Sequence, residues 1–376
     1  MSGGDFVRTM PVGQGLVRGQ PLYRLHIDIW LLLGLVAIVG FGLVMLYSAS
    51  GQSEVMLKAQ LGRVGVGFFV MFVAAQLPPR LYLRWSPFLY GAVLLMLVAV
   101  LFVGLSAKGS QRWLGIEGYP RFQPSELMKV AAPLMIAWYL NDRPLPPRFK
   151  HLAFALAMMA VPAGLIALQP DLGTAILVTT AGLGVIFLAG IYWSWLGYAA
   201  LAVGFSLPAL WVVMQDYQKE RVLTLFDPER DPLGAGWNII QSKTAIGSGG
   251  LYGKGLFDGT QSNLSFLPES HTDFIIAVIG EEIGFVGIVV LLLLYLGLIT
   301  RALYMANQIQ DTFGRLVVGG LTLTFFVYLF VNIAMVIGLL PVVGVPLPLI
   351  SYGGTSIVTL LGSFGIIMSI YTHRRR

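Results

Sequence analysis

The chain has 376 residues, of which 56% are hydrophobic and 11% are charged, and its mean hydropathy is +0.78. These values exclude a soluble protein of one or two domains and predict a polytopic membrane protein. The net charge of +6 comes from basic residues scattered between apolar runs, so no nucleic-acid partner is expected. Without cysteine, the chain has no disulfide, thiolate metal site or cysteine nucleophile, and its four histidines show no metal-ligand spacing.

A polar N-terminal tail at residues 1–26 precedes a single transmembrane domain at residues 27–372 and a short basic C-terminus at residues 373–376. The predicted fold class is all-α, a polytopic integral membrane protein with about ten transmembrane helices and one long extracytoplasmic loop. Ser-Ala-Ser at residues 48–50 is similar to a signal-peptidase site, but the long tail and the further runs favour an uncleaved anchor. The apolar runs cover roughly residues 29–47, 63–77, 86–105, 125–140, 151–168, 173–191, 194–214, 274–299, 316–338 and 354–371.

The basic residues predict the orientation of these runs, because cytoplasmic segments carry an excess of Lys and Arg. With the N-terminus inside, the cytoplasmic segments hold Arg8, Arg18, Arg24, Arg80, Arg84, Arg143, Arg148, Lys150, Arg301, Arg315 and the arginines at 374–376. The short outer loops hold only Lys58, Arg63, Lys108, Arg112 and Arg121. Both termini are therefore predicted to be cytoplasmic, and the long loop at residues 215–272 extracytoplasmic.

A polar segment ends at Asp273, directly before the apolar run that starts at Phe274. Asp273 is therefore expected at the outer membrane surface. A capping role is one interpretation, because a carboxylate at this position accepts bonds from free N–H groups and is favoured by the helix dipole. A chemical role on the outer face is the other.

Small and acidic residues follow Asp273 within the same run. Helical spacing puts Ala277, Gly280 and Gly284 on one face, and such a line of small residues lets another helix approach closely. Glu281 and Glu282 lie deeper in the run, where ionisable side chains are costly and face a protein interior or a water-filled cavity. The combination predicts that Asp273 sits on a tightly packed helix.

The loop at residues 215–272 carries many apolar side chains among its glycines and charges, and it is predicted to fold back onto the helices rather than to be disordered. Its segment 247–255 reads Gly-Ser-Gly-Gly-Leu-Tyr-Gly-Lys-Gly. It does not match a phosphate-binding loop, because Ser248 replaces the first glycine, Gly255 replaces Ser/Thr and no strand precedes it. Exposed N–H groups beside Lys243 and Lys254 would still receive an anion, and a flexible, solvated loop is the alternative.

Two shorter outer segments bring further polar groups to the same face. Glu126 and Lys129 are three residues apart at the start of the fourth run, so they share a helix face. They either form an ion pair within the bundle or face a substrate. Asp171 lies in Gln-Pro-Asp-Leu-Gly-Thr at residues 169–174, and from its position it is expected to cap the next helix.

Residues 338–356 are apolar but contain three prolines, which prevent a regular helix. Such a segment stays at membrane depth only where it is buried in protein or lines a cavity. Hydroxyls for that cavity would come from Ser351, Tyr352, Thr355 and Ser356. Asn332, inside the ninth run, is interpreted as a polar residue that holds helices together.

Several motifs in this order resemble the SEDS proteins of bacterial cell-wall synthesis, over nearly the whole chain from about residue 25. The segment Leu-Pro-Val-Val-Gly-Val-Pro-Leu-Pro (340–348) is more similar to the elongation branch, typified by RodA, than to the division branch, typified by FtsW. Thr355, where many members have Ser, is a conservative departure. The motifs are Gly-Ser-Gln-Arg-Trp (109–113), Phe-Gln-Pro-Ser-Glu (122–126) with Lys129, Gln-Pro-Asp-Leu-Gly-Thr (169–174), the segments 217–221 and 241–250, His-Thr-Asp-Phe (271–274) with Gly-Glu-Glu, and Pro-Leu-Ile-Ser-Tyr-Gly-Gly-Thr-Ser (348–356).

The resemblance implies a peptidoglycan glycosyltransferase that polymerises lipid II during cell elongation, at the outer face of the bacterial cytoplasmic (inner) membrane. The family's essential aspartate falls on Asp273, which implies that this carboxylate takes the proton of the acceptor's GlcNAc 4-hydroxyl. The departing undecaprenyl diphosphate needs cationic help from a divalent cation (Mg²⁺ or Mn²⁺) or from basic side chains; no organic cofactor is implied. The implied substrate-binding residues are Lys108, Arg112, Trp113, Glu126, Lys129, Asp171, Arg221, Gln241, Lys243, Ser351, Tyr352, Thr355 and Ser356.

The implied partners are lipid II, a class B penicillin-binding protein with transpeptidase activity, and other membrane proteins of the elongation complex. A flippase or transporter for the same lipid-linked precursor is the alternative function, because transporters also use broken helices and charges inside spans. A scaffold that only recruits the penicillin-binding protein is a third, and it requires Asp273 for folding alone. An acid at one surface, rather than near the midplane, favours the polymerase.

Overall fold

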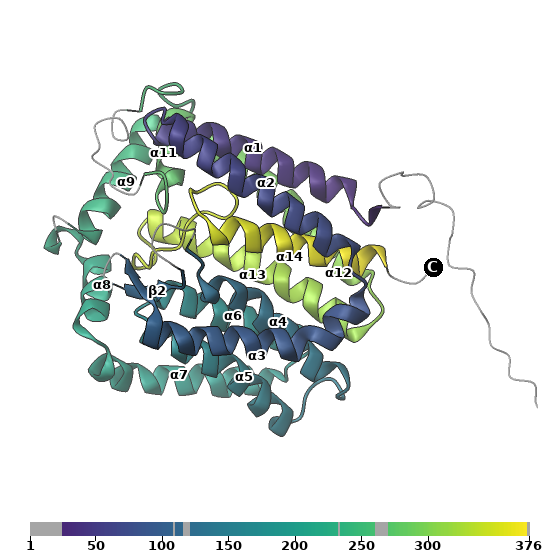
Figure 1. Ribbon diagram of the computed structural model, residues 1–376. Helices are drawn as coiled ribbons and strands as arrows, with labels where there is room; N and C mark the ends of the chain where they lie inside the picture. Colours follow the sequence, from purple (N-terminus) through teal and green to yellow (C-terminus); the bar gives the residue numbers. More distant parts are fainter. Residues whose placement is uncertain (1–24, 108–109, 116–120, 232–233, 260–269, 374–376) are drawn as a thin grey trace, which may run out of the picture.

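The computed structural model describes residues 25–107, 110–115, 121–231, 234–259 and 270–373. Every predicted apolar run is helical, and the long helices run side by side (Figure 1). The long helices are α1 (Ile29–Ala49), α2 (Glu54–Gln76), α3 (Pro79–Val103), α4 (Pro124–Asn141), α5 (Phe149–Leu168), α6 (Leu172–Leu188), α7 (Trp193–Val213), α12 (Gly284–Asn307), α13 (Thr312–Val336) and α14 (Thr355–Thr372).

Seven helices in the described part of the chain are long and apolar enough to cross a membrane, namely α1, α2, α3, α5, α12, α13 and α14. Helix α6 is apolar but has only 17 residues. The predicted fold class is therefore confirmed as a helical, multi-pass membrane protein, although seven helices rather than ten reach this length and apolarity. A two-stranded antiparallel sheet, β1 (Leu105–Ala107) with β2 (Ser110–Trp113), follows α3 and was not predicted.

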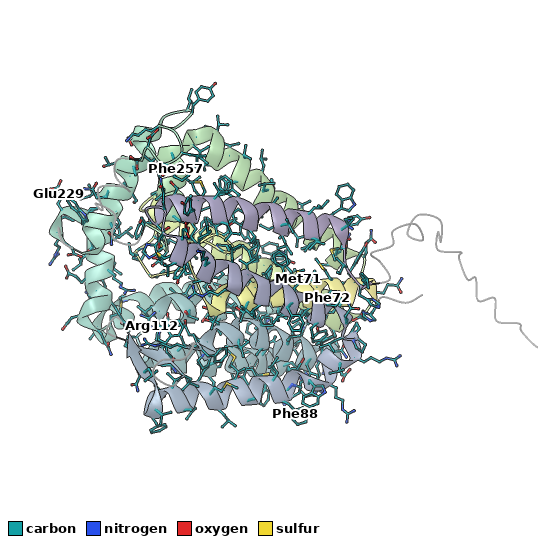
Figure 2. All side chains as sticks on the ribbon, turned by 45° about the horizontal axis from the view of Figure 1, so that its top comes forward. Met71, Phe72, Phe88, Arg112, Glu229 and Phe257 are labelled. Carbon is teal, nitrogen blue, oxygen red and sulfur yellow. The ribbon has the colours of Figure 1, made fainter. Side chains whose placement is uncertain are left out.

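The outer surface of the bundle is apolar, as a lipid-facing surface requires. Phe88 is 68% exposed and Phe72 is 40% exposed, whereas Met71 beside Phe72 is only 3% exposed (Figure 2). In the most apolar 18-residue stretch of each helix, 22% is buried inside the protein for α2 and α3, whereas 72% is buried for α13 and α14. Helices α13 and α14 therefore form the centre of the bundle, and α2 and α3 face outward.

Glycines let the central helices approach their neighbours closely. A Cβ built on Gly67 of α2 would lie 2.6 Å from Leu361 Cδ1 of α14, and one built on Gly365 of α14 would lie 2.4 Å from the Met71 carbonyl oxygen. Helix α13 meets α6 in the same way, because a Cβ on Gly320 would lie 2.4 Å from Val185 Cγ2. These contacts fix the helices that carry the polar groups of the site.

The described ends of the chain lie at the same end of the bundle. His26 Nδ1 lies 3.1 Å from Thr372 Oγ1, and the rings of His26 and His373 stack with centroids 3.7 Å apart. Arg301 Nε donates a 3.1 Å hydrogen bond to Asp28 Oδ1 there. The opposite end of the bundle carries α8, α9, α11 and β2 (Figure 1).

The predicted run at residues 274–299 is not one helix, which corrects the prediction made from its spacing. It consists of a short helix, α11 (Ile275–Glu282), and the span α12, which begins at Gly284. Gly284 has a φ of +77°, and a Cβ there would lie 2.3 Å from Gly253 N. Gly284 therefore allows a chain break and a close backbone approach, instead of extending the small face of α11.

In the described part of the long outer connection, α9 packs onto the bundle, as predicted for this loop. This part contains α8 (Asp216–Phe226), a 3₁₀ turn at Pro228–Arg230 and α9 (Ala235–Gly249). A Cβ on Gly249 would lie 1.9 Å from the Gly280 carbonyl oxygen, so α9 packs directly on α11 through two glycines. Ser242 Oγ of α9 donates a 2.8 Å hydrogen bond to the Val336 carbonyl oxygen at the end of α13.

In the glycine-rich segment after α9 two backbone N–H groups are bonded to α11, while Leu251 and Tyr252 are 63% and 81% exposed. Lys254 N donates to Glu281 O and Gly255 N donates to Glu282 O, each at 3.0 Å. Lys254 Nζ lies 2.7 Å from Glu281 Oε1, a carboxylate with no exposure. The prediction of an anion-receiving loop beside Lys254 is therefore wrong, because α11 already occupies these donors.

Candidate functional site

Asp273 lies in a turn at residues 270–274, at the end of the bundle opposite the chain termini. Helix α11 begins one residue later than predicted: its N-cap is Phe274, and no side chain of that residue makes a capping bond. Phe274 and all residues of α11 are buried, whereas His271, Thr272 and Asp273 are partly exposed. The aspartate is therefore an accessible acid on the edge of a packed helix.

Asn332 of α13 fixes the backbone of this turn. Its side-chain Nδ2 donates to the Asp273 carbonyl oxygen at 2.8 Å and to the Val345 carbonyl oxygen at 2.7 Å. Asn332 has no exposed surface, so both bonds form away from water, where an unmade bond is costly. Asn332 was interpreted as a residue that holds helices together, but its side-chain bonds go to two non-helical segments. What the sequence did not indicate is that one of these segments is the turn of Asp273.

The irregular segment between α13 and α14, residues 337–354, surrounds the same turn. Ser351 Oγ donates to the Thr272 carbonyl oxygen and accepts a 2.8 Å bond from Leu347 N, and Tyr352 N donates to the His271 carbonyl oxygen at 2.9 Å. A Cβ on Gly344, whose φ is +75°, would lie 3.7 Å from Asp273 Oδ2. The segment therefore holds the turn by its backbone and lies against the carboxylate.

This segment reaches into the bundle, as its composition predicted. Ile350 is 1% exposed and packs against α1, where a Cβ on Gly42 would lie 2.9 Å from Ile350 Cα. The Tyr295 hydroxyl of α12 donates to the Pro348 carbonyl oxygen. The irregular backbone at residues 347–351 is thus buried in protein, which is the condition for irregular backbone at membrane depth.

Arg112, Gln123 and Asp171 form a polar cluster beside this segment. Asp171 caps α6, accepting a 3.2 Å bond from Thr174 N, and it also accepts a 3.0 Å bond from Gln123 Nε2. Arg112 Nη1 of β2 lies 3.5 Å from Asp171 Oδ1. The capping prediction for Asp171 is confirmed, and the cap also holds a cation near the outer end of α6.

The Asp171 cluster and Asp273 flank the same short stretch of chain. A Cβ on Gly173, two residues after Asp171, would lie 2.6 Å from the Val343 carbonyl oxygen. The next residue along, Gly344, borders the Asp273 carboxylate, and Val345 is bound by Asn332. Residues 343–345 therefore separate the two acidic groups, and the structure brings both to one face.

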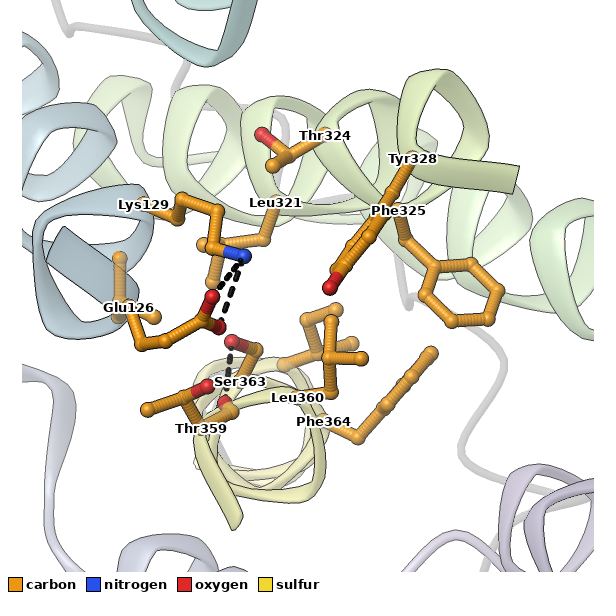
Figure 3. Close-up of a pocket in the computed structure, with 12 residues that line it drawn as sticks. Glu126, Lys129, Leu321, Thr324, Phe325, Tyr328, Thr359, Leu360, Ser363 and Phe364 are labelled. Atoms are coloured by element: carbon orange, nitrogen blue, oxygen red, sulfur yellow. Dashed lines mark hydrogen bonds and ion pairs between the residues drawn. The ribbon is translucent and has the colours of Figure 1, made fainter. Parts of the chain in front are cut away.

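Glu126 and Lys129 form the predicted ion pair, within a small pocket between α4, α13 and α14 (Figure 3). Lys129 Nζ lies 2.7 Å from Glu126 Oε2, and the two side chains are only 6–7% exposed. Lys129 Nζ also lies 4.3 Å from the centroid of the Tyr328 ring, a cation–π contact. Tyr328 and Asn332 are four residues apart on α13, so the pocket and the Asp273 turn lie on one side of that helix.

Known proteins match this chain over most of its length. The model of the cell cycle protein family of FtsW, RodA and SpoVE matches residues 20–376. The chain belongs to this family. Solved structures of relatives reproduce the fold of this chain with TM-scores of 0.71 and above.

Two named relatives are glycosyltransferases by their descriptions. The chain is 53% identical to peptidoglycan glycosyltransferase MrdB of Escherichia coli (strain K12) over 353 residues, covering 94% of the chain and 95% of MrdB. It is 37% identical to the probable peptidoglycan glycosyltransferase FtsW of Trichlorobacter lovleyi over 364 residues, covering 93% of the chain and 94% of FtsW.

Two solved structures have the same fold. One, described as the structural coordination of polymerization and crosslinking by a peptidoglycan synthase complex, has a TM-score of 0.83 at 34% identity and covers 93% of this chain and 98% of that chain. The other is the crystal structure of Thermus thermophilus Rod shape determining protein RodA, with a TM-score of 0.71 at 32% identity and the same coverage.

The remaining predicted site residues of this family member lie around the same end. Lys243 of α9 is exposed and lies over Gly338, where a Cβ would come within 2.7 Å of Lys243 Nζ. Gln241 and Arg221 are half-buried on α9 and α8. Trp113 ends β2, and Thr355 and Ser356 form the first turn of α14. Lys108 lies outside the described residues.

A resident metal does not fit the side chains that the structure describes. Among them no group of three or more His, Asp or Glu residues is placed to hold a metal ion. Asp171 and Glu126 lie against Arg112 and Lys129, respectively. A divalent ion held by protein needs several oxygen ligands. These two carboxylates already form ion pairs with an arginine and a lysine side chain.

Proposed function

We propose that this FtsW/RodA/SpoVE-family protein is a peptidoglycan glycosyltransferase that polymerises lipid II during cell elongation. The reaction takes place at the outer face of the bacterial cytoplasmic (inner) membrane, and both termini are cytoplasmic. The descriptions of the two named relatives support the activity. The observation that carries the proposal is the partly exposed Asp273 on a turn before a buried helix, with two cation-bearing clusters on the same face.

In the proposed reaction Asp273 acts as the general base. It accepts the proton of the acceptor's GlcNAc 4-hydroxyl while that oxygen bonds to the anomeric carbon of the donor MurNAc, and undecaprenyl diphosphate leaves with the bonding electrons. A positioned base of this kind contributes about 10²–10⁴-fold to the rate. Asn332 and Ser351 fix the backbone around Asp273, so its carboxylate meets the substrate without first being ordered.

Stabilisation of the departing diphosphate is assigned to basic side chains of the same face. Arg112 and Lys129 each lie against a carboxylate, which fixes their position and lowers the net charge around them. Lys243 and Arg221 add positive charge from α9 and α8. A Mg²⁺ or Mn²⁺ ion remains part of the proposal only as an ion carried by the substrate diphosphate, since Mg²⁺ commonly binds through substrate phosphates. Chelation with EDTA tests this requirement.

A class B penicillin-binding protein that cross-links the new strands is the proposed partner, together with other membrane proteins of the elongation complex. Support comes from the solved peptidoglycan synthase complex, whose description couples polymerization to crosslinking and whose matching chain covers 93% of this one. The apolar outer surface of the bundle is a suitable contact for a partner's membrane helix.

A lipid II flippase is the second candidate, and two features favour it: residues 337–354 form an irregular segment that is partly buried in the bundle, and the bundle also holds the buried ionisable pair Glu126–Lys129. The position of Asp273 argues against it, because transporters place their key charges near the bilayer midplane. A protein that only recruits the penicillin-binding protein needs no accessible carboxylate at all.

Purified protein in detergent, incubated with lipid II and Mg²⁺ or Mn²⁺, with and without the penicillin-binding partner, tests the proposal. Wild type is expected to make glycan chains, and an equally stable Asp273→Asn variant none. Chains from both variants would remove Asp273 from the chemistry. If neither makes chains in the presence of the partner, the flippase becomes the favoured function.

A further inference from the structure

Arg63 is a basic residue of α2 that lies beside the Asp273 turn and was not among the predicted site residues. Its guanidinium carbon Cζ lies 4.4 Å from the centroid of the Tyr352 ring. Tyr352 N is bonded to the His271 carbonyl oxygen, two residues before Asp273. Gln60, three residues before Arg63, donates from Nε2 to the Ser351 carbonyl oxygen at 3.3 Å. Arg63 is therefore held against the same segment that holds the acid.

Arg63, like Lys243, has no acidic partner among the described residues, whereas three other cations near this end of the bundle are paired. The paired cations are Arg112 with Asp171 (3.5 Å), Lys129 with Glu126 (2.7 Å) and Lys254 with Glu281 (2.7 Å). No carboxylate oxygen of the described residues lies within 4.0 Å of the Arg63 nitrogens. Its hydrogen bond within that part of the chain is a 3.5 Å contact from Nη1 to Gln60 Oε1. A guanidinium has five N–H donors, so most of them are available to a ligand.

The depth of Arg63 indicates what kind of anion it meets. Arg63 lies nine residues after Glu54, the first residue of α2, which places it about 14 Å along the helix at 1.5 Å per residue. The nearby side chains Leu61, Val66 and Phe69 are 47%, 55% and 68% exposed, as on a lipid-facing surface. A cation among apolar, lipid-facing side chains is costly unless it meets an anion, and the phosphate of a membrane lipid supplies one.

We propose that Arg63 binds the diphosphate of a lipid-linked substrate on the α2–α14 side of Asp273. This inference rests on the proposed function, in which donor and acceptor each carry a lipid-linked diphosphate, so two diphosphates have to be held around one acid. Arg112 and Lys129 supply cations from β2 and α4, and Arg63 supplies one from α2. Its planar fork suits a diphosphate, and the stack on Tyr352 orients that fork.

In this arrangement the isoprenoid chain follows the apolar outer face of α2, along Leu61, Val66 and Phe69, while the sugar reaches Asp273. Gly62 and Gly65 leave space beside Arg63, since a Cβ at either position would have no neighbour within 4 Å. The same chemistry, a lipid-linked phosphate at the interface, also exists in the headgroup of an anionic phospholipid. The experiment therefore has to separate the two sources.

The test compares Arg63→Gln with Lys58→Gln in lipid II polymerisation. Lys58 is a matched control, because it lies on the same helix, loses the same charge, is 75% exposed and is paired with Glu54 at 2.8 Å. Arg63→Gln is expected to raise the KM for lipid II about tenfold or more with little change in kcat, since charge-assisted bonds to the substrate are lost. Arg63→Lys should lie between, and Lys58→Gln should match wild type.

A binding assay separates failure of this inference from failure of the proposed function. In an Asp273→Asn background, where no turnover is expected, Arg63→Gln should weaken binding of lipid II and of undecaprenyl diphosphate about tenfold, with an unchanged melting temperature. If wild type polymerises lipid II and Arg63→Gln changes neither KM nor affinity, the role of Arg63 is refuted and the glycosyltransferase stands. If phosphatidylglycerol in the micelle competes as well as undecaprenyl diphosphate, Arg63 is a phospholipid site, and the inference is also refuted.

Discussion

The two ends of the bundle use an aspartate in different ways. At the end that holds the chain termini, Asp28 is 3% exposed, caps α1 through a 3.0 Å bond from Leu31 N, and is paired with Arg301. At the other end, Asp273 is partly exposed, and the bond from Asn332 goes to its backbone carbonyl. The first aspartate joins two helices, and the second lies partly exposed on a turn whose backbone is held by Asn332. The proposed function gives the first a structural role and the second a chemical one.

The Glu126–Lys129 pair is largely buried, and unlike Asp28–Arg301 it lies toward the Asp273 end of the bundle. Lys129→Met leaves the Glu126 carboxylate buried without its counter-charge, which costs about 3–5 kcal/mol of unfolding free energy. Thermal unfolding in detergent measures this loss. The double variant with Glu126→Gln should recover most of it. A single variant as stable as wild type would show that the Glu126 carboxylate does not depend on Lys129.

Asn332→Leu removes both bonds that fix the Asp273 turn and Val345. Leaving two buried carbonyl oxygens unbonded costs about 1–3 kcal/mol, and a shifted acid lowers the polymerisation rate up to about 10²-fold. The matched control is Thr322→Val on the same helix, because Thr322 bonds only to Val318 of its own turn. It should lose stability without losing turnover per folded molecule. Equal activity loss in both variants would contradict a specific role for Asn332.

Gly344→Ala tests the close packing of the irregular segment on the Asp273 carboxylate. With a φ of +75°, alanine is strained there by about 1 kcal/mol, and its Cβ would lie 3.7 Å from Asp273 Oδ2. A lower rate of polymerisation is expected, measured beside Gly297→Ala. Gly297 lies within α12, where a Cβ has no neighbour within 4 Å, so this control should keep wild-type activity and stability. Full activity of Gly344→Ala would show that the carboxylate tolerates a crowded neighbour.

The smallest expected effect is a change in how stability depends on pH, and it comes from Glu282 at the end of α11. Burial raises the pKa of Glu282 from its ordinary value of 4.5, against the lowering effect of its hydrogen bond from Ser48. The folded state therefore favours the protonated acid, and stability falls as pH rises from about 4.5 through the raised pKa. Glu282→Gln should flatten this slope in thermal unfolding measured across that pH range. A steeper slope in the variant would contradict a raised pKa for the Glu282 carboxyl.

The sequence predicted well the contacts between residues that lie within one helical turn of each other. The spacing of Glu126 and Lys129 predicts their ion pair, and the position of Asp171 before an apolar run predicts its cap, because both depend on one turn of helix. The bonds from Asn332 to Asp273 and from Ser351 to Thr272 join residues 59 and 79 positions apart. The spacing of residues along the sequence does not indicate contacts between positions so far apart.

The wrong predictions have the same physical origin. Gly284 fits the small face of a continuous helix, but its positive φ is set by the backbone of residues 251–253, which folds in from the outer loop. Lys254 was expected to be available to an anion, but a glutamate 27 positions away occupies it. Arg63 was used only to predict membrane orientation. Its contact with the Tyr352 ring depends on how α2 packs against α14, which the sequence does not indicate.

The most direct test of a chemical role for Asp273 compares Asp273→Asn with Asp28→Asn, the same substitution at the two ends, by lipid II polymerisation per folded molecule. Asp273→Asn should keep the wild-type melting temperature and lose at least about 10²-fold in rate. Asp28→Asn should melt lower, by weakening the contact with Arg301, and keep the wild-type rate. Comparable rates from both variants would contradict the assignment of chemistry to Asp273.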